Sequence, residues 1–164
     1  ESFASFIKQK YDSDYDSTCN YYRWKMTVSD KDLSSSFDSK ISDVGIIQNI
    51  YVRKRVSGGA AVSVVVEGDK NTVTLDSESL IRQAFGNAAV TLETNGGTVN
   101  TPYLPSTFCI FESQEKDGEK YFVITGGGFG HGIGMSQNAV NAMTKRGMSY
   151  KDILEFFYPG TKVA

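Results

Sequence analysis

Alternation of apolar and polar residues predicts that much of this chain folds into short strands. Residues 22–28 alternate as a strand with one buried face does. Two β-branched runs follow and meet at Ser57-Gly58-Gly59, which is typical of a hairpin turn. A polar turn at Asp117-Gly118 joins a later pair of runs. The predicted strands are residues 22–28, 46–56, 60–67, 71–75, 107–112 and 119–125.

Five other segments place apolar residues at helical spacing. Ser29 and Asp32 form a capping box at the start of one of them. Either Asp76 or Ser77 can cap the next, and Gly86 is its expected C′ residue. The predicted helices lie within residues 2–11, 29–37, 76–86, 136–147 and 149–158.

The order of these elements indicates the fold class. Strands do not alternate regularly with crossover helices, which argues against a doubly wound parallel sheet. We therefore expect an α+β fold, mainly an antiparallel sheet or a partly barrel-like one, with short helices including two at the C-terminus. Residues 87–105 are the least regular segment and are compatible with a hairpin around Asn95-Gly96-Gly97. The 164 residues fit a single domain, residues 1–164.

Composition excludes several classes of function. A net charge of −2 without a basic stretch argues against nucleic acid as a partner. No run approaches the ~20 apolar residues of a membrane span. Cys19 and Cys109 fit no zinc-site spacing, so we expect no metal and no cofactor. They could form a disulfide or serve as small buried hydrophobic residues, and the sequence leaves both open.

A glycine-rich run is the best candidate for a functional site. Glycine occupies every even position from 126 to 134, and His131 within it is the chain's single histidine. If the run were extended, alternate glycines would leave one face bare for a backbone or a ligand to approach. The spacing matches neither a dinucleotide fingerprint nor a phosphate-binding P-loop. We therefore exclude nucleotide binding.

Several residues of this run are candidate contacts, and each has a structural alternative. His131 could contact substrate or a catalytic carboxylate, flanked by Gly130 and Gly132, or it could simply hold the loop. Ser136 lies outside a nucleophile elbow and is most simply an N-cap. Gln137 could reach a ligand or hold the turn.

Arg23, Trp24 and Lys25 form a second candidate patch. On a strand, Arg23 and Lys25 share one face and Trp24 takes the other. We expect Trp24 in the core and the two cations at a binding cleft.

The stretch GGGFGHGIGMSQNAVNAMTKRGMSYKDILEFFYPGTKV resembles the C-terminal signature of the SpoIID/LytB family of bacterial cell-wall proteins. The signature contains a GHG-V/I-GMSQ core, an alanine-rich helix, a Gly-x-Ser-Tyr turn and a short helix closing on Tyr-Pro-Gly. Weaker matches lie upstream, at Arg23-Trp24, Ser57-Gly58, Ile81-Arg82 before Gly86, and Pro105-Ser106-Thr107-Phe108.

The resemblance implies a role in peptidoglycan remodelling outside the bacterial cell, at the cell wall or surface. A SpoIID-like lytic transglycosylase would cleave MurNAc-GlcNAc bonds to 1,6-anhydro products with a Glu in a Glu-Met-Pro-like motif. Nothing in this chain resembles that motif, so the chain is interpreted as the C-terminal portion of the family domain. Alone it would be inactive, and it would form a wall of the cleft.

The alternative is a non-catalytic module that binds peptidoglycan strands or activates other cell-wall hydrolases. The glutamates of the chain have ordinary strand, cap or turn contexts. They are Glu67, Glu78, Glu93, Glu112, Glu115 and Glu119.

Overall fold

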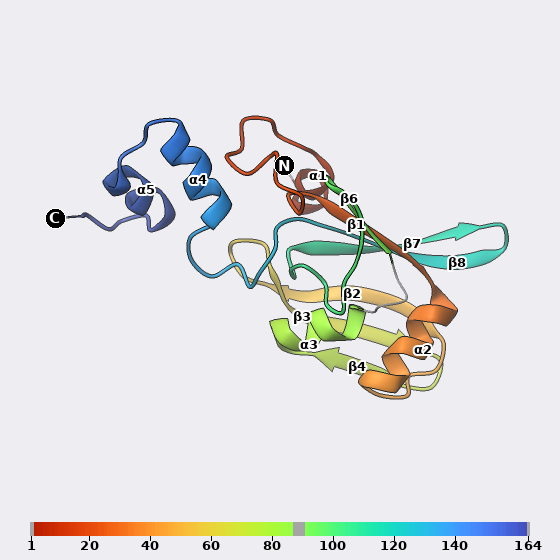
Figure 1. Cartoon of the computed structure of the whole chain (residues 1–164). Coiled ribbons are helices and arrows are strands. Elements are labelled where there is room, and N and C mark those ends of the chain that lie inside the picture. Colours follow the sequence, from red (N-terminus) through yellow and green to blue (C-terminus); the bar gives the residue numbers. More distant parts are fainter. Residues whose placement is uncertain (1, 87–90, 164) are drawn as a thin grey trace.

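The computed structural model describes residues 2–86 and 91–163, and within them it contains two antiparallel sheets and five helices (Figure 1). The larger sheet has the strand order β6-β5-β1-β8-β7, and the smaller has the order β2-β3-β4. The strands are β1 (Trp24–Ser29), β2 (Ile47–Arg55), β3 (Ala61–Gly68), β4 (Thr72–Leu75), β5 (Thr91–Thr94), β6 (Gly97–Asn100), β7 (Cys109–Lys116) and β8 (Glu119–Gly126). The helices are α1 (Phe3–Lys8), α2 (Asp30–Lys40), α3 (Glu78–Phe85), α4 (Gln137–Lys145) and α5 (Tyr150–Phe157).

The predicted α+β class is confirmed, and the described strands form no closed barrel. The hairpin predicted at Ser57-Gly58-Gly59 joins β2 to β3, and the one at Asp117-Gly118 joins β7 to β8. The irregular segment does contain a hairpin, β5–β6. Its residues 87–90 lie outside the described residues.

Serine caps begin the helices as the sequence predicts. The Ser29 hydroxyl accepts a hydrogen bond from the Asp32 amide and donates one to the Asp32 carboxylate. Ser77, rather than Asp76, caps α3. The first helix, Phe3–Lys8, lies within the predicted segment 2–11. One detail of the predictions is wrong, because Gly86 is extended (φ −80°, ψ 130°) instead of left-handed.

The core lies between the two sheets, with α2 and α3 packed against it. Strand β1 follows the predicted alternation, since Trp24, Met26 and Val28 are buried and the residues between them are exposed. Both cysteines are free, and burial raises the pKa of the Cys109 thiol to about 12. Cys109 therefore behaves as a small buried hydrophobic residue, which was one of the two alternatives.

Trp24 sets the geometry where the large sheet ends. Trp24 is 2% exposed and lies opposite Gly126 in the register of β1 and β8. A Cβ on Gly126 would sit 2.2 Å from Cζ2 of the indole, so no other residue fits there without displacing it. The indole Nε1 donates to the carbonyl of Gly128, 3.1 Å away. The end of β8 is thus fixed against the core.

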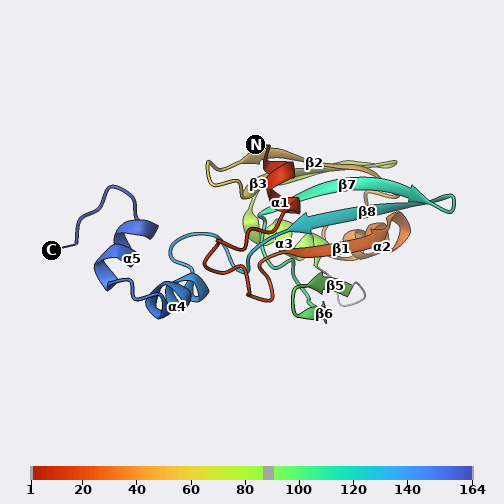
Figure 2. The ribbon, with the colours of Figure 1, turned by 90° about the horizontal axis from the view of Figure 1, so that it is seen from above.

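The C-terminal helix pair, α4 and α5, stands to one side of the sheets in both views (Figures 1 and 2). Its side-chain contacts with the N-terminal loop converge on Tyr15. Arg146 stacks over the Tyr15 ring at 4.7 Å, and the ring meets Phe156 edge-on at 5.7 Å. The Tyr15 hydroxyl donates to the sulfur of Met148. None of the described helices is long and apolar enough to cross a membrane.

Gly126→Ala should destabilise the fold, because its methyl group would overlap the Trp24 indole. Overpacking of this kind lowers the free energy of unfolding by about 1–3 kcal/mol. The matched control is Gly58→Ala, where a Cβ has nothing within 4 Å and the backbone is not left-handed. That change should be neutral or stabilise by up to about 1 kcal/mol. Urea unfolding measures both, and equal stabilities would contradict the packing argument.

Tyr15→Ala should loosen the C-terminal helix pair without unfolding the sheets. The cation–π and ring contacts removed are worth roughly 1–2 kcal/mol. We therefore expect amides of α4 and α5 to exchange with deuterium about tenfold faster, with β1 and β8 unchanged. Tyr51→Ala, at an exposed tyrosine of β2, is the control. Unchanged exchange in α4 would show that other contacts hold the pair.

Candidate functional site: the glycine loop

The chain leaves the large sheet at Gly126 and crosses to α4 through residues 127–135, here called the glycine loop. The prediction of an extended run with one bare face is wrong. Gly128, Gly130, Gly132 and Gly134 all have positive φ, at 75°, 122°, 75° and 96°. An extended strand requires negative φ, whereas positive φ is readily adopted only by glycine. The alternate glycines therefore serve the backbone conformation of a winding loop.

The glycines of this segment serve two different purposes. At Gly126 and Gly127 a Cβ would strike the Trp24 ring or approach the Tyr22 carbonyl oxygen at 2.8 Å, so close packing requires glycine. At Gly128, Gly130 and Gly132 a Cβ would meet nothing within 4 Å. Backbone conformation alone requires glycine there, and the space beside these residues is open.

The first half of the loop is fastened to the body by hydrogen bonds. The amides of Gly127, Gly128 and Gly130 donate to the carbonyls of Phe108, Tyr21 and Pro105, at 2.8–3.0 Å. The Gly127 carbonyl accepts from the buried Ser106 hydroxyl at 2.7 Å. With the Trp24 bond to the Gly128 carbonyl, five hydrogen bonds hold residues 127–130. This half of the loop has a defined position.

The second half is exposed. Within residues 2–86 and 91–163, the backbone of residues 131–135 makes no hydrogen bond to the sheets. Its internal bond runs from the Ile133 amide to Nδ1 of His131, at 2.9 Å. Because Nδ1 accepts, a neutral His131 carries its proton on Nε2. The exposed edge of the imidazole is therefore a hydrogen-bond donor. Nδ1 of His131 therefore holds the loop, and this bond leaves Nε2 free of it.

Ser136 and Gln137 lie where the loop enters α4. The Ser136 hydroxyl accepts from the Ala139 amide at 3.2 Å, which confirms its predicted capping position. Gln137 is the first residue of α4 and is exposed.

The second predicted patch divides into two different environments. Trp24 is core, as expected. Arg23 donates to the carbonyls of Gln9 and Tyr22 and lies 4.2 Å over the Tyr22 ring. Its NH1 would be 3.1 Å from a Cβ at Gly127, so it lies against the start of the loop. Lys25 is exposed on β1, opposite Thr125 and Glu93, with no ion pair among the described residues.

Two aromatic residues at the loop were not among the predicted contacts. Phe129 is 67% exposed, and its ring lies 4.8 Å from that of Tyr21. An aromatic residue flanked by two glycines was the signal that could have identified it.

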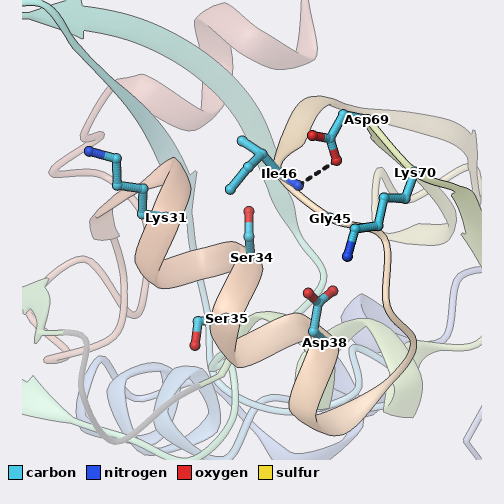
Figure 3. Close-up of a pocket in the computed structure, with 8 residues that line it drawn as sticks. All are labelled: Lys31, Ser34, Ser35, Asp38, Gly45, Ile46, Asp69 and Lys70. Carbon is cyan, nitrogen blue, oxygen red and sulfur yellow. Dashed lines mark hydrogen bonds between the residues drawn. The ribbon is translucent and has the colours of Figure 1, made fainter.

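The two cavities found among the described residues have no lining residue from the glycine loop. The larger, about 360 Å³, is a shallow hollow beside α2 (Figure 3). Its acidic side chains are engaged, since Asp38 accepts from the Val44 amide and Asp69 from the Ile46 amide. The residues that line it are Lys31, Ser34, Ser35, Asp38, Gly45, Ile46, Asp69 and Lys70. A second hollow, about 230 Å³, is lined by residues of α2 and of the β7–β8 hairpin.

The glutamates seen in ion pairs or hydrogen bonds have structural partners. Glu78 pairs with Arg82 at 2.9 Å, and Glu112 pairs with Lys8 at 2.7 Å. On α5, a hydrogen bond from Lys162 holds the pKa of Glu155 below its ordinary value. A catalytic general acid needs the opposite change, a pKa raised above its ordinary value.

Among the described residues, no group of three or more His, Cys, Asp or Glu could hold a metal ion.

Two curated bacterial proteins match short stretches of the chain. It is 55% identical over 47 residues to the amidase enhancer of Bacillus subtilis (strain 168), a match that covers 29% of this chain and 6% of the relative. It is 46% identical over 41 residues to stage II sporulation protein D of the same organism, which covers 25% of the chain and 12% of the relative. The matched stretches thus span a small part of these relatives' length.

A family match covers far more of the chain. It spans residues 1–134, and so takes in both sheets, the first three helices and the glycine loop as far as Gly134. The match ends where the chain turns from the loop toward the C-terminal helix pair. Because it covers most of the 164 residues, the chain belongs to the family described as "Domain of unknown function (DUF8618)".

Proposed function

We propose that this chain binds the glycan strands of bacterial peptidoglycan through the glycine loop and the start of α4. The partial similarity to the amidase enhancer and to stage II sporulation protein D supports a peptidoglycan-related role. The observation that carries the proposal is the geometry of His131, an exposed residue whose Nδ1 accepts a hydrogen bond from the loop, so that its Nε2 carries the donor. A hydrogen-bond donor beside exposed apolar side chains suits a sugar ring with its hydroxyl and acetamido groups.

In the finer form of the proposal, the chain supplies one wall of the substrate cleft of a lytic transglycosylase. A Glu from another part of the protein would protonate the glycosidic oxygen. The 6-hydroxyl of the muramic acid would then attack C1 and lose its proton to the same carboxylate, leaving a 1,6-anhydro end. His131 would orient the glycan or that carboxylate, since its outward nitrogen is a donor. Gln137 and Arg23 would border the site. The protein would act at the cell wall or surface.

One experiment separates catalysis from binding. The full-length parent protein and residues 1–164 are each incubated with purified glycan strands, and the products are analysed by mass spectrometry. We expect 1,6-anhydro ends from the parent and none from residues 1–164 alone. If residues 1–164 alone formed 1,6-anhydro ends, that result would contradict the proposal that the catalytic Glu lies in another part of the protein. Binding without product from the parent would favour the alternative, a module that binds peptidoglycan or activates other cell-wall hydrolases.

Substitutions at His131 separate loop structure from ligand contact. His131→Asn places an oxygen where Nδ1 accepts from the Ile133 amide, but it removes the outer donor. His131→Ala removes both. We expect both variants to weaken glycan binding by about three- to tenfold, because one hydrogen bond contributes about 0.5–1.5 kcal/mol. Isothermal titration calorimetry measures the affinity.

The same two variants carry a control for folding. His131→Asn should retain the thermal stability of the unmodified chain, since the loop acceptor is kept. If His131→Asn bound glycan normally and His131→Ala did not, the role of His131 would be confined to holding the loop.

A further inference from the structure

We propose that Phe129, backed by Tyr21, is an aromatic platform on which a sugar ring of the glycan stacks. The proposal rests on the function proposed above and deepens it by assigning one subsite to one side chain. Phe129 is 67% exposed, although a phenyl ring ordinarily gains free energy by burial. Single exposed apolar residues are common on protein surfaces, and what distinguishes Phe129 is that its backbone is tied to the core and its ring lies against Tyr21.

The position of Phe129 is fixed on both sides. The Gly128 amide donates to the Tyr21 carbonyl, and the Gly130 amide donates to the Pro105 carbonyl, each at 2.8 Å. The Gly128 carbonyl accepts from the Trp24 indole at 3.1 Å. Phe129 therefore projects from a backbone tied to the core rather than from a loose loop. Little conformational entropy remains to be lost when a ligand contacts it.

One side of the ring is supported and its surroundings are open. Tyr21 lies with its ring centroid 4.8 Å from that of Phe129, at an interplanar angle of 46°. Apart from the adjacent residues, nothing lies within 4 Å of a Cβ placed at Gly128 or Gly130, the two residues that flank Phe129. No other segment therefore occupies the space beside these two glycines. A sugar ring can approach the exposed part of the Phe129 ring there.

The chemistry beside Phe129 favours a sugar over a protein partner. His131 presents its donor two residues away, so an apolar face and a polar contact lie on one short loop. A stable protein interface needs about 800 Å² on each side. Ile133, 81% exposed, would extend the apolar surface, but it lies on the half of the loop without described hydrogen bonds to the sheets. A single sugar ring is small enough to be bound by the hydrogen-bonded half of the loop, residues 127–130, alone.

The single tryptophan provides a direct readout. Its indole N–H is bonded to the residue before Phe129, so its nuclear magnetic resonance signal should move when a ligand occupies the platform. The probe is a GlcNAc-MurNAc tetrasaccharide without stem peptides, titrated into residues 1–164. We expect Phe129→Ala and Phe129→Leu to weaken its binding about tenfold. Phe129→Tyr, which keeps the flat face, should bind within about twofold of the unmodified chain.

The control is Tyr51→Ala, at a 43% exposed tyrosine on the smaller sheet, which should bind normally. Phe129→Leu keeps apolar volume against Tyr21, so it carries the test if Phe129→Ala disturbs the loop. If the unmodified chain binds the tetrasaccharide and Phe129→Leu binds it equally well, the proposal that a sugar ring stacks on Phe129 is contradicted, whereas the proposed function is not. If the unmodified chain binds no tetrasaccharide, the proposed function itself fails.

Discussion

The contact between the Trp24 indole and the backbone of residues 126–128 determines where the rest of the candidate site lies. Trp24 is fully within the core, yet its ring edge lies against Gly126 and its nitrogen is bonded to Gly128. The large sheet therefore ends at a defined point, and the loop that follows starts in a defined direction. Because the interior is close-packed, moving either partner would disturb the core as well as the loop. Residues 126–128, from which the exposed loop starts, are therefore held in place by a core residue.

The short upstream motifs at Ile81-Arg82 and Pro105-Ser106-Thr107-Phe108 also help to support the glycine loop. Gly86, which follows Ile81-Arg82, lacks a Cβ because Tyr103 lies against it, with its Cα 2.2 Å from where that Cβ would be. The Arg82 guanidinium then donates to the Leu104 carbonyl at 2.7 Å. Residues 105–108, next along the chain, bond the glycine loop through their carbonyls and the Ser106 hydroxyl. Motifs that are separate in the sequence thus form one chain of contacts, from α3 through residues 102–108 to the loop.

The sequence predicts the elements of this fold better than the shape of its loop. Strand alternation and serine caps are local signals, and β1, both major hairpins and the capped helices follow them. The conformation of residues 127–135 depends on partners from β1 and from residues 105–108, which no local pattern identifies. Glycine at alternate positions fits a bare extended strand as well as a series of left-handed residues, and only the positive φ values distinguish them. The prediction of a left-handed Gly86 after α3 is wrong for the same reason. Glycine is needed at this position because Tyr103 lies against it, and no local pattern identifies that neighbour.

The contrast between the two halves of the loop bears on how it could bind a ligand. Ordering several glycines lowers stability, because glycine loses more backbone freedom on folding than other residues do. In residues 127–130, five hydrogen bonds offset that loss before any ligand arrives, so Phe129 is pre-positioned. Among the described hydrogen bonds, residues 131–135 have one internal bond, from the Ile133 amide to His131, and no backbone bond to the sheets. Under the proposed function, the anchored backbone at Phe129 would give a glycan a fixed apolar contact, and the donor of His131 would lie beside it on the less anchored half of the loop.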